Sequence, residues 1–135
     1  GNYEVTGARR LGSSFIIRHG FYEGNALVLS TYVQGKWYVM AWNKLVSRPL
    51  VLQHKLYFQE GIVHEDDLWS FKLACMAQSM YVVGETTYYY SMQPDSIMRA
   101  PSMRNLECRV LVLGYIYDFI RSSRCLQITG IYYIF

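Results

Sequence analysis

Four titratable residues follow one another at His64-Glu65-Asp66-Asp67, with Val63 before them and Leu68-Trp69 after them. Carboxylates are costly to bury unless they are paired, hydrogen-bonded or close to a metal. A cluster of them bordered by large apolar side chains therefore needs an explanation. A carboxylate held in place can accept the proton of a sugar or alcohol hydroxyl as that hydroxyl attacks. Glu65, Asp66 and Asp67 are thus candidates for a general base.

Helix capping is the simplest alternative for the same cluster. Residues 67–79 predict a helix, and acids near its first turn suit the positive end of the helix dipole. That position is expected to lower the carboxylate pKa, which weakens the base but keeps it ionised. The two roles can coexist, because a carboxylate fixed at a helix start is also well placed for chemistry. His64 could bind a metal, although a lone histidine beside acids is more often a hydrogen-bonded structural group.

Aromatic residues form the second group that could do chemistry, here by stacking on a sugar ring. Tyr88-Tyr89-Tyr90 and Trp42 are the candidates. In a strand, alternate residues point to opposite faces, so such a tyrosine run more often divides between core and surface. Trp42 likewise suits a core position. The sequence contains no glycine-rich phosphate loop, nucleophile elbow, His-Glu-x-x-His or Asp-x-Asp motif, so no metal site is predicted within this chain.

Composition limits the class of protein. The chain has 135 residues, enough for one core, and residues 1–135 are therefore expected to form a single domain. Charged residues are 17% and hydrophobic residues 52% of the chain, which predicts a folded and unusually apolar domain. A net charge of +3 without a run of Lys or Arg argues against nucleic acid as a partner.

The cysteines and the apolar stretches bear on location. Cys75, Cys108 and Cys125 are odd in number and lack metal-binding spacing, which favours a reducing compartment. No apolar stretch reaches the roughly 18–20 residues of a membrane-spanning helix. A cytoplasmic location is expected, with contact to the inner membrane surface left open.

The elements that would position these groups predict a mixed α/β (α+β) fold, in which a few short strands pack with helices. Hydrophobic spacing and turn residues predict a loose segment at 1–14, strands at 15–17, within 37–45, at 80–83 and at 86–90, a turn at 93–96, and helices at 26–34, 49–55, 67–79 and 102–123. Ser47 is a possible cap of the second helix.

Two helices carry most of the predicted core. Helix 67–79 has two apolar stripes and is expected to be buried, with only Ser70, Lys72 and Gln78 on a polar side. The last helix carries apolar residues at 3-4-3-4-3 spacing, which predicts a seam packed on another helix or on a sheet. That seam consists of Met103, Leu106, Val110, Leu113, Tyr117 and Ile120. An apolar tail, 125–135, follows it.

The motifs occur in an order that resembles a known family. In sequence they are Trp42-Asn43-Lys44-Leu45, Glu60-Gly61-Ile62, His64-Glu65-Asp66-Asp67, Val82-Val83, Tyr88-Tyr89-Tyr90 and Ser96-Ile97-Met98. Their spacing resembles the C-terminal half of bacterial glycosyltransferase family 2, whose catalytic domain has the GT-A fold. The resemblance covers about residues 26–120. It departs at Ser91, where the family often has arginine, and in lacking the nucleotide-binding half.

The resemblance implies an activity and roles for residues. The family transfers a sugar from a nucleotide-sugar to an acceptor hydroxyl with inversion, which here implies cell-surface polysaccharide synthesis on a glycan or lipid-linked acceptor. It implies that Asp66, paired with Glu65, is the catalytic base. His64, Trp42, Asn43, Lys44 and Tyr88 would form the acceptor side. A divalent metal, Mg or Mn, would be held by the nucleotide-binding half.

Taken as a partial GT-A domain, the chain is expected to be inactive when isolated and to self-associate through exposed apolar surface. The alternative is a non-catalytic α/β module that binds a partner or a glycan through its aromatic residues. The presence or absence of a nucleotide-binding half upstream of Gly1 would distinguish the two.

Overall fold

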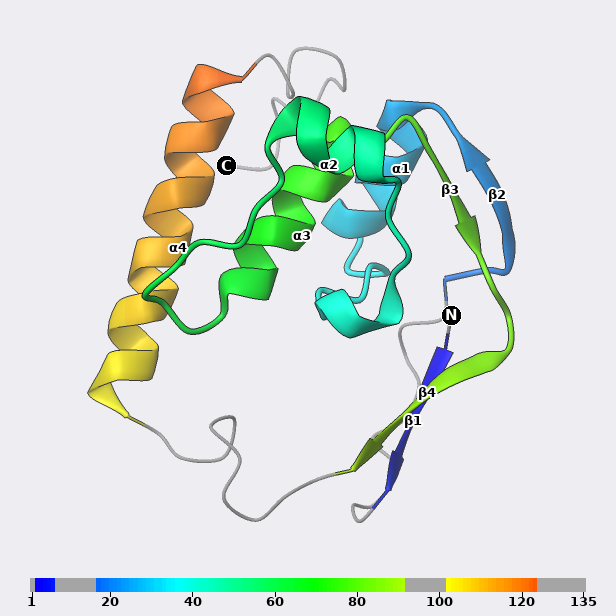
Figure 1. Cartoon of the computed structure of the whole chain (residues 1–135), viewed down its shortest axis with the longest axis horizontal. Coiled ribbons are helices and arrows are strands. Elements are labelled where there is room, and N and C mark those ends of the chain that lie inside the picture. Colours follow the sequence, from blue (N-terminus) through cyan, green and yellow to red (C-terminus); the bar gives the residue numbers. More distant parts are fainter. Residues whose placement is uncertain (1, 7–16, 92–101, 124–135) are drawn as a thin grey trace.

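The computed structural model describes residues 2–6, 17–91 and 102–123, and these residues form a mixed α+β domain (Figure 1). Within them the order of elements is β1 (Asn2–Thr6), β2 (Gly20–Glu23), α1 (Asn25–Val33), the 3-10 turn η1 (Ala41–Asn43), α2 (Arg48–His54), α3 (Glu65–Met76), β3 (Ser79–Val82), β4 (Thr86–Ser91) and α4 (Met103–Ser122). The predicted class is therefore confirmed. None of the described helices is long and apolar enough to cross a membrane.

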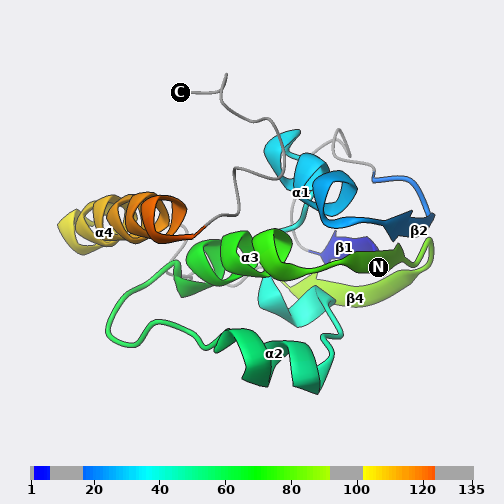
Figure 2. The same cartoon turned by 90° about the horizontal axis from the view of Figure 1, so that it is seen from above.

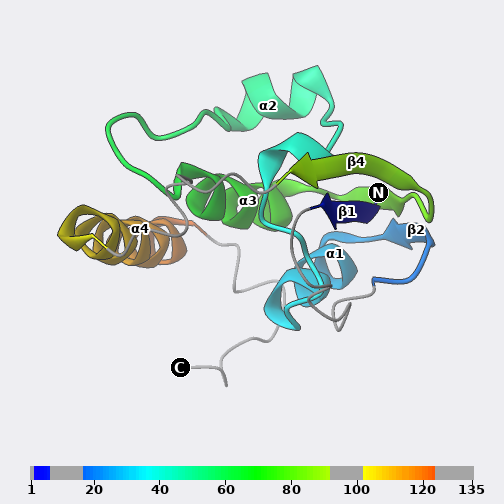
Figure 3. The same cartoon turned by 90° about the horizontal axis from the view of Figure 1, so that it is seen from below.

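Helix α3 lies at the centre, with α1 and α2 on opposite sides of it and α4 alongside it (Figures 1, 2 and 3). Its apolar residues serve two clusters. Phe71, Ala74 and Cys75 pack with Leu29 of α1, and residues of α4 cover this cluster. Trp69 and Leu73 pack with Leu56, and α2 covers that side. Burial of α3, predicted from its two apolar stripes, is confirmed.

The C-terminal end of α3 is capped by a residue from another helix. The last carbonyls of a helix have no partner within it and must find one elsewhere. The side-chain amide Nδ2 of Asn25, the first residue of α1, donates to the carbonyls of Ala74, Cys75 and Ala77 at 3.3, 2.8 and 2.9 Å. Asn25 is buried, so this contact joins the start of α1 firmly to the end of α3.

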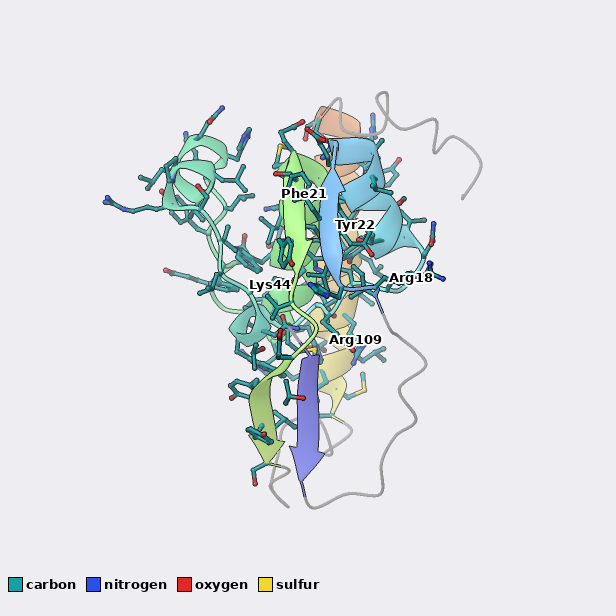
Figure 4. The ribbon with its side chains drawn as sticks, turned by 90° about the vertical axis from the view of Figure 1, so that its right-hand side faces the viewer. Arg18, Phe21, Tyr22, Lys44 and Arg109 are labelled. Carbon is teal, nitrogen blue, oxygen red and sulfur yellow. The ribbon has the colours of Figure 1, made fainter. Side chains whose placement is uncertain are left out.

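The strands form two pairs. β2 and β3 are antiparallel, with Phe21 opposite Tyr81, and β1 and β4 are parallel, with Tyr3 opposite Tyr88. β3 and β4 follow one another in the chain and form one continuous segment. β2 and β1 lie along the same side of that segment (Figure 4). The segment carries the chain from the end of α3 to the tyrosine run.

Helix α4 begins at a serine cap, where the Ser102 side chain accepts a hydrogen bond from the Asn105 amide at 3.1 Å. One face of α4 packs inward. Cys108 and Val112 are buried, and the Phe119 ring meets the Phe71 ring edge to face with their centroids 6.0 Å apart. The predicted seam lies elsewhere on the helix. Most of it is exposed, namely Met103, Leu106, Val110, Leu113 and Tyr117. The predicted packing is wrong for these five residues, because α4 is apolar on a second face and that face meets α3.

Several predicted elements differ from the structure. Residues 2–6 of the expected loose segment form β1, and residues 41–43 of the expected strand form the turn η1. Helix α3 starts two residues before the predicted helix and stops three residues earlier. Ser70, placed on its polar side, is completely buried. For two of these differences a partner distant in sequence decides the outcome. β1 pairs with β4, and the Ser70 hydroxyl donates to the Val39 carbonyl before η1.

The remaining predicted elements are confirmed within one or two residues. They are the helices at 26–34, 49–55 and 102–123 and the strands at 80–83 and 86–90. Ser47 precedes α2 as predicted, but its side chain makes no capping hydrogen bond. The turn at 93–96, the tail at 125–135 and all but Ile17 of the strand at 15–17 lie outside the described residues.

Candidate functional site

The acidic cluster forms the first turn of α3. Glu65, Asp66 and Asp67 are its first three residues, and His64 is its N-cap residue. His64 has φ 67° and ψ 28°, a left-handed conformation uncommon for residues other than glycine. Its side chain does not cap the helix, and its buried Nε2 has no hydrogen-bond partner among the described residues. Acids suit this end of a helix because of its dipole, and the Asp66 carboxyl also accepts hydrogen bonds from the Asp66 and Asp67 backbone amides.

Asp66 stands apart electrostatically from an ordinary capping acid. Partial burial raises the pKa of its carboxyl above the ordinary value, and the negative charges of Asp67 and Glu65 raise that pKa further. Hydrogen bonds from the Asp66 and Asp67 backbone amides act in the opposite direction but do not prevail. The backbone amides of the helix start thus lower the pKa as expected, but burial and like charges outweigh them, and the expected net lowering is wrong for Asp66. A raised pKa makes the carboxylate a stronger base once it is ionised.

The aromatic candidates Trp42 and Tyr88 are brought together. Trp42, in η1, stacks on Tyr88 with ring centroids 4.0 Å apart and planes at 24°, and lies nearly parallel to Tyr90 at 5.8 Å. Tyr88 and Tyr90 are two residues apart on β4 and share a face. Trp42 keeps 36% of its surface exposed and Tyr88 keeps 37%. The three rings form an aromatic platform that is open on part of its surface, rather than a buried core.

Lys44 follows η1, and its side chain turns inward (Figure 4). The ammonium donates to the carbonyl of Tyr38, to the carbonyl of Met40 at 2.7 Å and to the Asn43 side-chain oxygen at 2.8 Å. It also lies 5.5 Å from the centre of the Trp37 ring. Burial lowers the pKa of Lys44 to about 8, while the negative charge of Asp66 acts to raise it. Lys44 thus links the segment around η1 electrostatically to the acidic end of α3.

A groove of about 810 Å³ runs beside this segment. One wall consists of residues before and within the Trp42 motif, and the other of residues on β2 and β3. Its lining includes Trp37, Tyr38, Trp42, Asn43 and Lys44 on the first wall and Phe21 and Tyr81 on the second. Such a mixture of aromatic rings and a few polar groups suits a ligand with both apolar and hydrogen-bonding surfaces.

The structure divides the predicted site residues into two groups. Trp42, Asn43 and Lys44 line the groove, and Tyr88 joins them by stacking on Trp42. His64, Glu65 and Asp66 do not line it, and the charge of Asp66 on Lys44 is what connects the groups. Among the described residues, no group of three or more His, Cys, Asp or Glu is placed to hold a metal ion.

Sequence reasoning missed Trp37 and Ser70. Trp37 contacts Lys44 and belongs to the same aromatic stretch as Trp42, so the density of rings in residues 37–42 was an available signal. Ser70 donates from its hydroxyl to the carbonyl of Val39. Its position four residues after Asp66, on the same face of α3, was the corresponding signal.

Comparison with known proteins returned no matching family model, no matching curated protein and no matching solved structure.

Proposed function

We propose that this chain is the acceptor-side part of an inverting glycosyltransferase of family 2, in which Asp66 is the general base and Glu65 its charged neighbour. The observation that carries the proposal is the environment of Asp66. A partly buried carboxylate with a raised pKa, fixed at the start of the central helix, has the properties of a base. The ordered motifs around it resemble those of the family.

The reaction that this arrangement would perform is a single displacement. The acceptor hydroxyl gives its proton to the Asp66 carboxylate while its oxygen attacks the anomeric carbon of the donor sugar. The bond from that carbon to the nucleotide diphosphate breaks with its electron pair leaving on the diphosphate, so the configuration inverts. Trp42 would hold the acceptor by stacking on the apolar face of a sugar ring, on a glycan or lipid-linked acceptor in cell-surface polysaccharide synthesis.

A second candidate is a non-catalytic module that binds a glycan or a protein partner. The observation in its favour is the platform of Trp42, Tyr88 and Tyr90 beside the groove, since a stacking surface does not require a catalytic carboxylate. In that case the acids at the start of α3 would serve the helix dipole alone.

Turnover of the full gene product, including any sequence upstream of Gly1, separates the candidates. Asp66→Asn keeps the shape of the side chain and removes the base, so transfer from a panel of nucleotide-sugars should fall by about 10²–10⁴-fold. Asp67→Asn, the matched change one residue later, is expected to keep most of the turnover. Wild-type turnover in the Asp66→Asn protein would exclude the catalytic role.

Donor binding by the isolated chain provides an independent measurement. The chain contains no Asp-x-Asp motif, so titration with uridine diphosphate and Mn²⁺ in a calorimeter is expected to release no binding heat. Tight, metal-dependent binding would mean that the donor site lies within these 135 residues and that the division into an acceptor side is wrong.

A further inference from the structure

Three successive backbone carbonyls before Trp42 each accept a hydrogen bond from a side chain. The Lys44 ammonium donates to the carbonyls of Tyr38 and Met40. The Ser70 hydroxyl donates to the carbonyl of Val39, which lies between them in the chain. In an extended segment, successive carbonyls point to opposite sides. Two side chains from different parts of the fold thus hold residues 38–40 together.

The hydrogen-bonding capacity of Lys44 is used up in this arrangement. A lysine ammonium has three N–H donors and no acceptor. All three have partners within the chain, namely two carbonyls and the Asn43 side chain. No N–H donor of Lys44 remains for an acceptor hydroxyl. Lys44 therefore contributes to the site by placing the segment that carries Trp42.

Ser70 provides the connection to the acidic end of α3. Residues four apart on a helix lie on the same face one above the other. Ser70 is four residues after Asp66, and it is completely buried against the segment whose Val39 carbonyl it binds. The same face of α3 therefore carries both the carboxylate and the hydroxyl that fixes the approach to η1.

We propose that Lys44 and Ser70 are positioning residues, which hold the aromatic platform at Trp42 in a fixed place relative to Asp66. This inference rests on the function proposed for Trp42 and Asp66. An apolar side chain would fill the same space without the cost of removing an ammonium from water. Burial does lower the pKa of Lys44 to about 8, which is the sign of that cost. A partly buried polar network in which every ammonium donor has a partner favours one geometry, and here that geometry is the one that places Trp42.

The test uses 5-fluorotryptophan and fluorine NMR on the whole chain, whose three tryptophans are Trp37, Trp42 and Trp69. Trp69 serves as an internal reference, because its indole donates to the Leu56 carbonyl at 3.1 Å within the core. Lys44→Met should move the Trp42 resonance toward that of free tryptophan, as the ring-current effect of Tyr88 is lost, while Trp69 stays in place. The matched control is Lys36→Met, which removes an exposed lysine from the same groove.

Ser70→Ala is the second variant, needed in case Lys44→Met does not fold. It should move the Trp42 resonance in the same direction, and the double variant should move it no further than the larger single change, because both act on one segment. A Trp42 resonance unchanged in either folded variant would overturn the proposal. Equal movement of all three tryptophan resonances would also overturn the proposal, because it would mean that the whole fold has loosened. Since no sugar is present, these outcomes leave the proposed transferase activity to its own test.

Discussion

Helices α3 and α4 meet along one face, but they are buried to very different extents. Leu68 and Leu73 of α3 are 2% and 4% exposed, because α1, α2 and α4 surround that helix. Leu106 and Leu113 of α4 are 57% and 66% exposed, because α4 meets the rest of the described chain on one side only. The spacing of apolar residues indicates which faces a helix can bury. Which of them it does bury depends on how many other elements surround it.

The largest expected effect is on the stability of α3. Leu73→Ala removes a buried side chain from the cluster with Leu56 and Trp69, leaves a cavity, and should lower the free energy of unfolding by about 2–5 kcal/mol. Urea denaturation measures this change. The matched substitution Leu113→Ala on the exposed face of α4 should change the free energy of unfolding by no more than about 0.5 kcal/mol. Similar losses at both positions would mean that the α4 face is covered after all.

The exposed face of α4 sharpens the expectation that the chain self-associates. Large apolar patches on a surface tend to become contacts, and this face presents five large side chains in a row. Light scattering should show species larger than the monomer as concentration rises. Leu106→Glu combined with Leu113→Glu should suppress them, whereas Leu52→Glu, at an exposed leucine of α2, should not. A clean wild-type monomer at high concentration would refute the expectation.

The smallest expected effect distinguishes the two roles of the acidic cluster. The folded-state pKa of Asp66 is raised above 3.8, so between 3.8 and the folded-state pKa this carboxyl binds more protons in the folded chain than in the unfolded chain. Stability therefore falls as pH rises through this range, and ionised Asp66 destabilises the fold at neutral pH. Asp66→Asn should raise the melting temperature slightly at neutral pH, and this gain should disappear well below pH 3.8.

A pure capping role predicts the opposite sign for that variant. If Asp66 served only the helix dipole, replacing it with neutral Asn would cost about 0.3–1 kcal/mol, and the melting temperature would fall at neutral pH. Calorimetric scans of the wild type, Asp66→Asn and Asp67→Asn across the acidic range measure the sign directly. A gain in stability on removing the Asp66 charge would fit a functional role, since active sites often cost stability.

The amino-acid sequence by itself determined the types and approximate limits of most elements. The apolar stripes of α3, the serine cap of α4 and the run of threonines and tyrosines in β4 are local signals, since each depends on residues within a few positions of one another. The acidic cluster and the Trp42 motif were also visible as candidates, because their residue types are unusual next to large apolar neighbours.

Tertiary structure alone decided how these parts meet. β1 depends on a partner more than 80 positions away, and the choice between the two apolar faces of α4 depends on where α3 lies. Burial and like charges raised the pKa of Asp66 although its local position predicted the reverse. Ser70 became a partner of the Val39 carbonyl only when α3 packed against that segment. Burial and pairing depend on contacts between distant residues, and spacing along the chain carries no record of those contacts.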